Sequence, residues 1–210
     1  MLGCSALKIE RPIHKYLVRL LSLVFLKLSI IMVNIVKIKG FHTCRLNGWE
    51  KAPFLSEDNK RQWLTQGYYF WTDSSHFAHK WGKTSIQGDY AIVECAIEME
   101  RKYLLDLVGS VEDQLYFQKI ATRYHEVLKK QKPDAKQPTV NVILAFYRKN
   151  GLFPYHAIKA QDMYKEQKVT FIHDKNASLP LVTRQQLCLF GCAFECIKDK
   201  QIIHPEIVGK

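Results

Sequence analysis

The chain has 210 residues, a length that can bury a hydrophobic core and that suggests a single domain. Its 31 lysine and arginine residues against 20 acidic residues give a net charge of +11, which favours a negatively charged partner such as nucleic acid or a phosphate-rich ligand. The six cysteines lack the dense spacing of a small secreted disulfide scaffold, which argues against that class and favours a reducing, cytoplasmic location.

Residues 1–32 are predicted to form a helical accessory segment in front of the folded domain. The run 20–36 is nearly apolar and follows several basic residues, which is the charge order of a signal sequence or a membrane anchor. Lys27 interrupts this run, and its apolar part is shorter than the roughly 20 residues that a membrane-spanning helix needs. Membrane association is therefore the less favoured alternative. Met32 is a second possible start of the protein, and both starts stay open.

Residues 33–210 are predicted to form the domain itself, beginning with a strand. From residue 33 to residue 41, β-branched and polar residues alternate with the period of a half-buried strand. This strand is expected to end at His42 and Thr43. Residues 45–65 contain glycine, proline and a charged stretch, so a loop with a short helix is expected there.

The segment GYYFWTD, residues 67–73, has the aromatic richness of a strand. Asp73 or Ser74 is expected to cap a following helix, because a short oxygen-bearing side chain can satisfy the free amides of the first turn. This helix is predicted to run from about Ser75 to Trp81 and to be closed by Gly82.

Residues 89–99 are predicted to form another strand. Ser110 with Asp113 three residues later predicts a capping box at the start of a long amphipathic helix. This helix should end at the polar segment 129–138. The following segment, 139–146, is compatible with a strand or with a buried helix, and the pattern leaves both open.

The C-terminal third is predicted to consist of short strands. The candidates are residues 156–160, 168–174, 184–190 and 201–204. Short strands then outnumber long helices, which predicts an α+β domain.

No metal site is predicted. His76 and His79 lie three residues apart, without an acidic or cysteine partner nearby, and are interpreted as surface residues. Cys188, Cys192 and Cys196 repeat every four residues, but the segment around Cys188 alternates like a strand and a glycine follows, so the three thiols are not expected to share a face.

Polar and aromatic residues at the strands suggest a nucleotide site. The sequence lacks glycine-rich phosphate loops and the usual hydrolase motifs. His42 could hold a ribose hydroxyl, the ring of Tyr69 could stack on a flat heterocycle, and the amide of Gln186 could fix a second hydroxyl. Taken singly, each residue is more simply explained by a structural role than by nucleotide binding: His42 as an interior histidine, Tyr69 as a core residue and Gln186 as a surface residue.

Taken in order, these residues resemble the ADP-ribosyltransferase superfamily, in the branch of diphtheria toxin and the poly(ADP-ribose) polymerases with its His…Tyr…Glu signature. The segment QGYYFWTDSSHFAHKW, residues 66–81, is similar to the Gly-x-Tyr-Phe strand and following helix of that family. It is more similar still to bacterial toxin-like members with a Gly-x-Tyr-Phe-Trp stretch. The resemblance extends from about Ile38 to Ile203 and implies an α+β fold of split antiparallel sheets with flanking helices.

The resemblance also implies NAD as co-substrate and a set of binding residues. His42 matches the histidine that holds the adenosine-side ribose of NAD, and Thr43 beside it would contribute backbone contacts to the nicotinamide amide. Gly67 is the glycine of the central motif, and Tyr69 matches the tyrosine beneath the nicotinamide. Trp81 matches roughly the second aromatic residue that covers the other side of that ring.

Gln186 matches the catalytic position on the last core strand, with Gln185 as the alternative assignment. The family carries glutamate there, and a carboxylate would stabilise the cationic transition state through its charge, which glutamine lacks. The family also usually has glycine after the first histidine, where this chain has Thr43. The sequence shows no obvious general base for the acceptor. Either the nucleophile supplies its own reactivity, or a loop residue such as Glu50 or Glu57 acts as the base.

The function implied is a mono-ADP-ribosyltransferase toxin that transfers ADP-ribose from NAD to a macromolecule. The basic surface favours nucleic acid, RNA or DNA, over protein as the acceptor. An antitoxin protein is a possible partner. The alternative is a non-catalytic basic module that binds single-stranded nucleic acid through exposed aromatic residues.

Overall fold

The computed structural model describes residues 34–57, 62–162, 167–170 and 178–206. The described residues from Ile35 onward belong to one compact unit. The predicted accessory segment 1–32, with Met32 and most of the apolar run 20–36, lies outside the described residues. No helix in the described part of the chain is long and apolar enough to cross a membrane.

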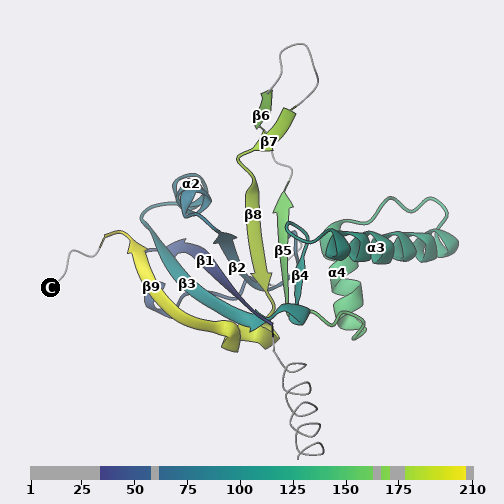
Figure 1. The fold of residues 1–210 in the computed structure, drawn as a ribbon, viewed down its shortest axis with the longest axis horizontal. Coiled ribbons are helices and arrows are strands. Elements are labelled where there is room, and N and C mark those ends of the chain that lie inside the picture. The colour runs from purple at the N-terminus through teal and green to yellow at the C-terminus, as the bar shows by residue number, and fades with distance from the viewer. Residues whose placement is uncertain (1–33, 58–61, 163–166, 171–177, 207–210) are drawn as a thin grey trace, which may run out of the picture. The chain divides into compact units, whose positions relative to one another are not determined.

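Within the described residues, seven strands form one sheet in the order β4-β5-β8-β2-β1-β3-β9 (Figure 1). Their bounds are Ile35–Arg45 (β1), Tyr68–Thr72 (β2), Tyr90–Glu100 (β3), Leu104–Asp106 (β4), Ala157–Asp162 (β5), Arg184–Leu189 (β8) and Ile197–His204 (β9). Neighbouring strands are antiparallel except β4 and β5, which are parallel. Between β5 and β8 in the chain, β6 (Gln167–Thr170) and β7 (Ser178–Leu181) pair with each other, so only the first part of the strand predicted at 168–174 is described.

Three α-helices accompany the sheet in the described part: α2 (His76–Ser85), α3 (Val111–Gln131) and α4 (Val140–Lys149). Short 3-10 helices span Trp49–Lys51, Arg101–Tyr103 and Gly191–Cys196. The predicted α+β class is therefore confirmed. The segment 139–146, which the pattern left open, is helical because α4 buries Ile143, Leu144 and Tyr147 at helical spacing.

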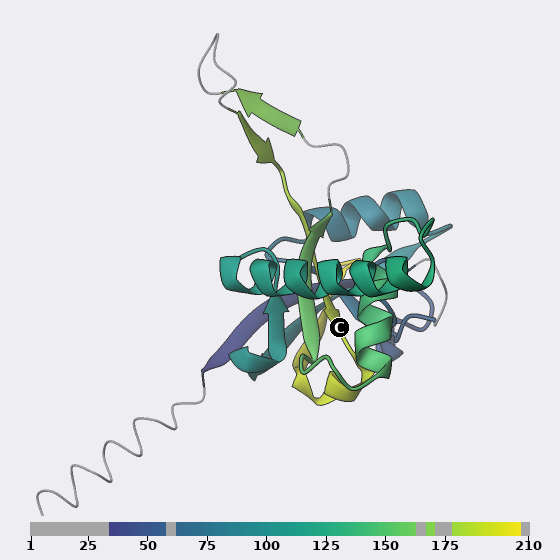
Figure 2. The same ribbon diagram turned by 90° about the vertical axis from the view of Figure 1, so that its right-hand side faces the viewer.

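The sheet has core residues on both faces. On one face, α3 and α4 pack over β4, β5 and β8, and Figure 2 shows α3 running across these strands. Leu105, Leu144, Ile158 and Cys188 are among the buried residues there. On the same face, α2 packs over β1 and β3. The opposite face of the sheet buries a second set of residues, which includes Phe70, Val93, Leu187 and Leu189.

Two predicted boundaries are wrong. The strand β1 continues to Arg45, so His42 and Thr43 lie inside it, because both residues still pair with β3. The helix α2 continues past Gly82 to Ser85. A Cβ atom at Gly82 would lie 2.3 Å from Cδ2 of Tyr90, so this glycine serves the close approach of α2 to β3 and does not end the helix.

The predicted helix caps are formed in part. The N-cap residue of α2 is Ser75, which makes no side-chain capping bond, and not the predicted Asp73 or Ser74. Oγ of Ser74 nevertheless accepts a hydrogen bond from the backbone N–H of His76 over 3.2 Å. Ser110 is the N-cap of α3 and accepts from the N–H of Asp113 over 3.2 Å. The carboxylate of Asp113 does not complete the box, because it accepts from Arg101 instead over 2.7 Å.

The two halves of the sheet are joined by a narrow contact. Along its whole length β1 pairs with β3, but in the described structure it pairs with β2 at only two positions, Gly40 with Thr72 and Phe41 with Trp71. Beyond Phe41 the two strands diverge. A Cβ atom at Gly40 would lie 2.9 Å from Cβ of Phe70 on β2. A glycine is therefore needed where β1 and β2 come close together. Where split antiparallel sheets were expected, the described strands other than β6 and β7 form one sheet that opens between β1 and β2.

Candidate functional site

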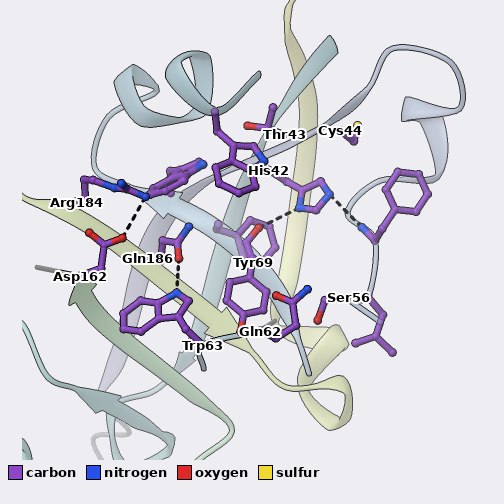
Figure 3. A pocket seen from close by; sticks show the side chains of 15 residues that line it. His42, Thr43, Cys44, Ser56, Gln62, Trp63, Tyr69, Asp162, Arg184 and Gln186 are labelled. Carbon is purple, nitrogen blue, oxygen red and sulfur yellow. Dashed lines mark hydrogen bonds and ion pairs between the residues drawn. The ribbon is translucent and has the colours of Figure 1, made fainter. Parts of the chain in front are cut away.

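A cavity of about 400 Å³, called here the β1–β2 pocket, lies where β1 and β2 diverge (Figure 3). It is lined by His42, Thr43, Cys44, Phe54, Leu55, Ser56, Gln62, Trp63, Tyr69, Phe70, Trp71, Trp81, Asp162, Arg184 and Gln186. Of the residues matched to the family's catalytic and NAD-binding positions, all except Gly67 are in this set. The fold therefore brings together residues that the sequence separates widely.

His42 is buried, with 9% of its surface exposed, in the opening between the strands. Its Nε2 atom lies 3.3 Å from the backbone N of Phe54 and its Nδ1 atom lies 2.9 Å from the carbonyl oxygen of Tyr69. Because the N–H of Phe54 donates, Nε2 is the unprotonated nitrogen and Nδ1–H donates to Tyr69. Burial lowers the pKa of His42, which favours this neutral form. Both ring nitrogens are therefore bonded to backbone groups, which fixes the ring in the pocket wall.

Tyr69 is fixed by its hydroxyl group. The hydroxyl donates to the carbonyl oxygen of Thr65 over 2.6 Å and accepts from the N–H of Leu64 over 3.1 Å. Burial raises the pKa of Tyr69, so the phenol stays protonated. Since the hydroxyl is engaged with the backbone, the ring is the part of Tyr69 that can contact a ligand.

Gln186 lines the pocket next to Tyr69, and Figure 3 shows its amide between Tyr69 and Asp162. Its Oε1 atom accepts from Nε1 of Trp63 over 2.7 Å. This bond fixes the amide with its NH₂ group as the donor. Gln185 points to the other face of β8, because side chains alternate along a strand, and donates to Oγ1 of Thr183 over 2.9 Å. Of the two adjacent glutamines, Gln186 is therefore the pocket residue.

Thr43 and Trp81 line the pocket from β1 and α2. Oγ1 of Thr43 donates to the carbonyl oxygen of Ala78 over 3.1 Å, so this side chain ties β1 to α2. Trp81 is 45% exposed, and its ring centroid lies 6.3 Å from that of Trp71. Its ring is therefore at the rim of the pocket and accessible to a ligand.

Gly67 has a structural role in the described fold, in contrast to the cofactor contact expected from the motif. It does not line the pocket. A Cβ atom there would lie 2.5 Å from Sγ of Cys188 and 2.8 Å from the carbonyl oxygen of Leu189. Its N–H donates to Oγ of Ser56 over 3.0 Å, and the N–H of Ser56 donates back to its carbonyl oxygen over 3.0 Å. Gly67 thus positions Ser56, which does line the pocket.

Sequence reasoning missed Trp63 and an ion pair at the pocket wall. Nη2 of Arg184 lies 3.1 Å from Oδ2 of Asp162, and its guanidinium carbon lies 5.5 Å from the ring centre of Trp71. Among the described lining residues, Asp162 is the only carboxylate. Alternation along β8 already places Arg184 on the face of Gln186, but the pairing with Asp162 depends on the register of β5 with β8.

Glu50 and Glu57, the carboxylates considered as bases, do not line the pocket. Glu50 is exposed on the surface near Lys200, whose Nζ donates to its carbonyl oxygen over 2.9 Å. Asp162 therefore replaces them as the acidic group available to a ligand in the pocket.

Comparisons with protein-family models, curated proteins and solved structures found no match to the chain. The arrangement of side chains in the β1–β2 pocket is therefore the basis for a functional conclusion. Its features are a neutral histidine bonded to two backbone groups, an oriented amide donor, a fixed tyrosine ring and one carboxylate paired with one guanidinium.

Proposed function

We propose that this protein is an NAD-dependent ADP-ribosyltransferase. The observation that carries the proposal is the meeting of His42, Tyr69 and Gln186 in one pocket at the opening of the sheet. These residues come from β1, β2 and β8. They stand at the three signature positions of the ADP-ribosyltransferase superfamily, with glutamine at residue 186 where the family has glutamate.

The strand order suggests how NAD would lie. In the sheet β2 lies between β8 and β1, so Tyr69 lies between Gln186 and His42. The nicotinamide ring would stack on the ring of Tyr69. The amide of Gln186 would donate to a hydroxyl of the nicotinamide ribose. Nε2 of His42 would exchange its bond from the N–H of Phe54 for one from a hydroxyl of the adenosine ribose.

In the reaction, the bond between nicotinamide and C1′ of the ribose breaks, and nicotinamide leaves with the bonding electrons. Positive charge then develops on the ribose. A carboxylate at residue 186 would stabilise this charge directly, whereas Gln186 contributes a hydrogen bond and orientation alone. We therefore expect slow turnover, and we expect Gln186→Glu to accelerate nicotinamide release.

The test is the release of nicotinamide from NAD, measured by chromatography, together with the shift of the melting temperature that NAD produces. His42→Ala and Gln186→Ala should each reduce release at least about tenfold, because each removes a group that holds the reacting ribose or its partner. Tyr69→Phe keeps the stacking ring and should retain activity, whereas Tyr69→Ala should lose it.

The matched control is Gln185→Ala, which removes the neighbouring glutamine on the opposite face of β8. This variant should release nicotinamide at the wild-type rate. Unchanged release in both His42→Ala and Tyr69→Ala, with both variants folded by their melting curves, would refute the proposed site.

The second candidate is a non-catalytic module that binds nucleic acid. The observation in its favour is Gln186 itself, a neutral residue already bonded to Trp63 at the position where a catalytic carboxylate would be needed. This candidate predicts salt-sensitive nucleic-acid binding and no stabilisation by NAD.

A further inference from the structure

Another cavity, of about 380 Å³, adjoins the β1–β2 pocket and is called here the α2 cavity. The two share a wall formed by Trp71, Trp81, Asp162 and Arg184, which line both. The rest of the α2 cavity comes from one face of α2, including Phe77 and Lys80. A ligand in this cavity would therefore touch the same residues as a ligand in the pocket.

The α2 cavity offers aromatic rings to a flat ligand. Trp81 is exposed at 45% and Phe77 is half-buried, and both rings lie against Trp71, with centroid distances of 6.3 and 5.7 Å. Trp71 itself is buried and provides the base of the cavity. A large ring left exposed at a cavity edge is a stacking surface for any of the four bases.

Cationic groups lie beside these rings. Arg184 is held between Asp162, at 3.1 Å, and the ring of Phe77, at 6.0 Å from its guanidinium carbon. Lys80 is exposed on α2, one residue before Trp81. Aromatic rings interleaved with Lys and Arg are the composition that binds single-stranded nucleic acid, in which unpaired bases stack and phosphates pair with the cations. The net charge of +11 favours the same partner.

We propose that the α2 cavity is the acceptor site and holds an unpaired base of a single-stranded nucleic acid. This inference rests on the proposed function, since it supplies the acceptor for that reaction. In Figure 3, Asp162 and Arg184 lie on one side of Gln186 and His42 lies on the other. If His42 holds the adenosine ribose of NAD, C1′ of the nicotinamide ribose would be open toward the shared wall. The base in the α2 cavity would lie beyond that wall.

The transfer step balances with the groups at this wall. A nitrogen of the base that carries a hydrogen attacks C1′ and forms a new N-glycosidic bond. The bond from C1′ to nicotinamide breaks, and nicotinamide leaves as a neutral molecule with the bonding electrons. The proton of the attacking nitrogen passes to the carboxylate of Asp162, which is the only acidic residue among the described residues lining either cavity.

The test uses fluorescently labelled short oligonucleotides of mixed sequence, as single-stranded DNA, single-stranded RNA and a DNA duplex, with the full chain at low salt. Fluorescence anisotropy should show tighter binding of a single strand than of the duplex. Comparing single-stranded DNA with single-stranded RNA shows whether the protein prefers deoxyribose or ribose. Lys80→Ala and Trp81→Ala should each weaken single-strand binding by about tenfold, since each removes a phosphate or stacking contact. The matched control is Lys83→Ala, an exposed lysine of α2 outside the cavity, which should bind as the wild type does.

Equal binding by Lys80→Ala, Trp81→Ala and Lys83→Ala would overturn the inference, as would transfer of labelled ADP-ribose from NAD to protein and not to the oligonucleotides. Nicotinamide release is measured on the same samples without oligonucleotide. Release of nicotinamide with no oligonucleotide binding overturns this inference and leaves the proposed enzyme intact. Binding that depends on Lys80 and Trp81, with neither release nor stabilisation by NAD, refutes the enzyme and supports the second candidate.

Discussion

The β1–β2 pocket and the α2 cavity share a wall, but their side chains are held in different ways. In the pocket, His42 and Tyr69 bond through their polar atoms to the backbone of neighbouring segments. In the cavity, Lys80 and Trp81 are exposed on α2, and Arg184 is held by ring contacts and an ion pair. A side chain bonded to buried backbone groups cannot move without leaving those groups unsatisfied, whereas an exposed side chain can turn. We therefore expect the pocket to be preorganised and the cavity to adapt.

The largest expected effect is at Gly67, behind the pocket. In Gly67→Ala the new Cβ atom would meet Cys188 and the backbone of Leu189, so we expect a loss of about 3 kcal/mol in the free energy of unfolding. Urea denaturation measures this loss. Gly191→Ala is the control, because its Cβ atom would come no closer than 3.9 Å to the side chain of Leu55. Equal stability of the two variants would show that the pocket is not rigid at this point.

The next effect compares Tyr69, the ring of the β1–β2 pocket, with Trp81, the exposed ring of the α2 cavity. Tyr69→Phe removes the hydroxyl that bridges Leu64 and Thr65 and leaves these backbone groups without that partner, so we expect a loss of about 1–3 kcal/mol. Trp81→Ala removes an exposed ring and should cost about 1 kcal/mol or less. Urea denaturation of both variants checks the order. A larger loss for Trp81→Ala would remove the distinction between the pocket and the cavity.

A smaller effect is expected in the pH dependence of stability. Burial lowers the pKa of His42 in the folded protein, so the unfolded chain binds a proton more readily. Stability from this residue is therefore fully present above the ordinary histidine pKa of about 6.5 and is lost as the pH falls below it. Urea denaturation of the wild type and of His42→Gln across this range should show a steeper loss in the wild type. The pKa of His79, also lowered by burial, affects both proteins alike. Parallel curves would contradict the buried, neutral state of His42.

The smallest effect is expected at the ion pair of the shared wall. Asp162→Asn removes the charge that faces Arg184, but both side chains are partly exposed and Arg184 keeps its ring contacts, so we expect a loss of about 0.5–1 kcal/mol. Raising the salt concentration should reduce the difference between wild type and variant. A loss above 3 kcal/mol would mean that the pair is a buried structural element and not an adaptable wall.

Local sequence patterns predicted most elements of the fold. Alternation predicted β1, β3 and β8, and Ser110 was predicted to begin α3. The end of α2 was predicted wrongly, since Gly82 is a helix-ending residue by local rules but contacts Tyr90 in the fold. The ambiguous segment 139–146 became a helix because apolar surface on β4 and β5 was available to cover it.

For the candidate site too, some features could be predicted from the sequence and others depend on the tertiary structure. The motif around Tyr69, with His42 before it and a glutamine on the last core strand, could be found from the sequence because residue types and order along the chain are local information. The choice of Gln186 over Gln185, the bond from Trp63 and the pairing of Asp162 with Arg184 were decided by the tertiary structure. These contacts depend on strand register between segments far apart in the chain, and a shift of one residue would turn every side chain of β8 to the opposite face.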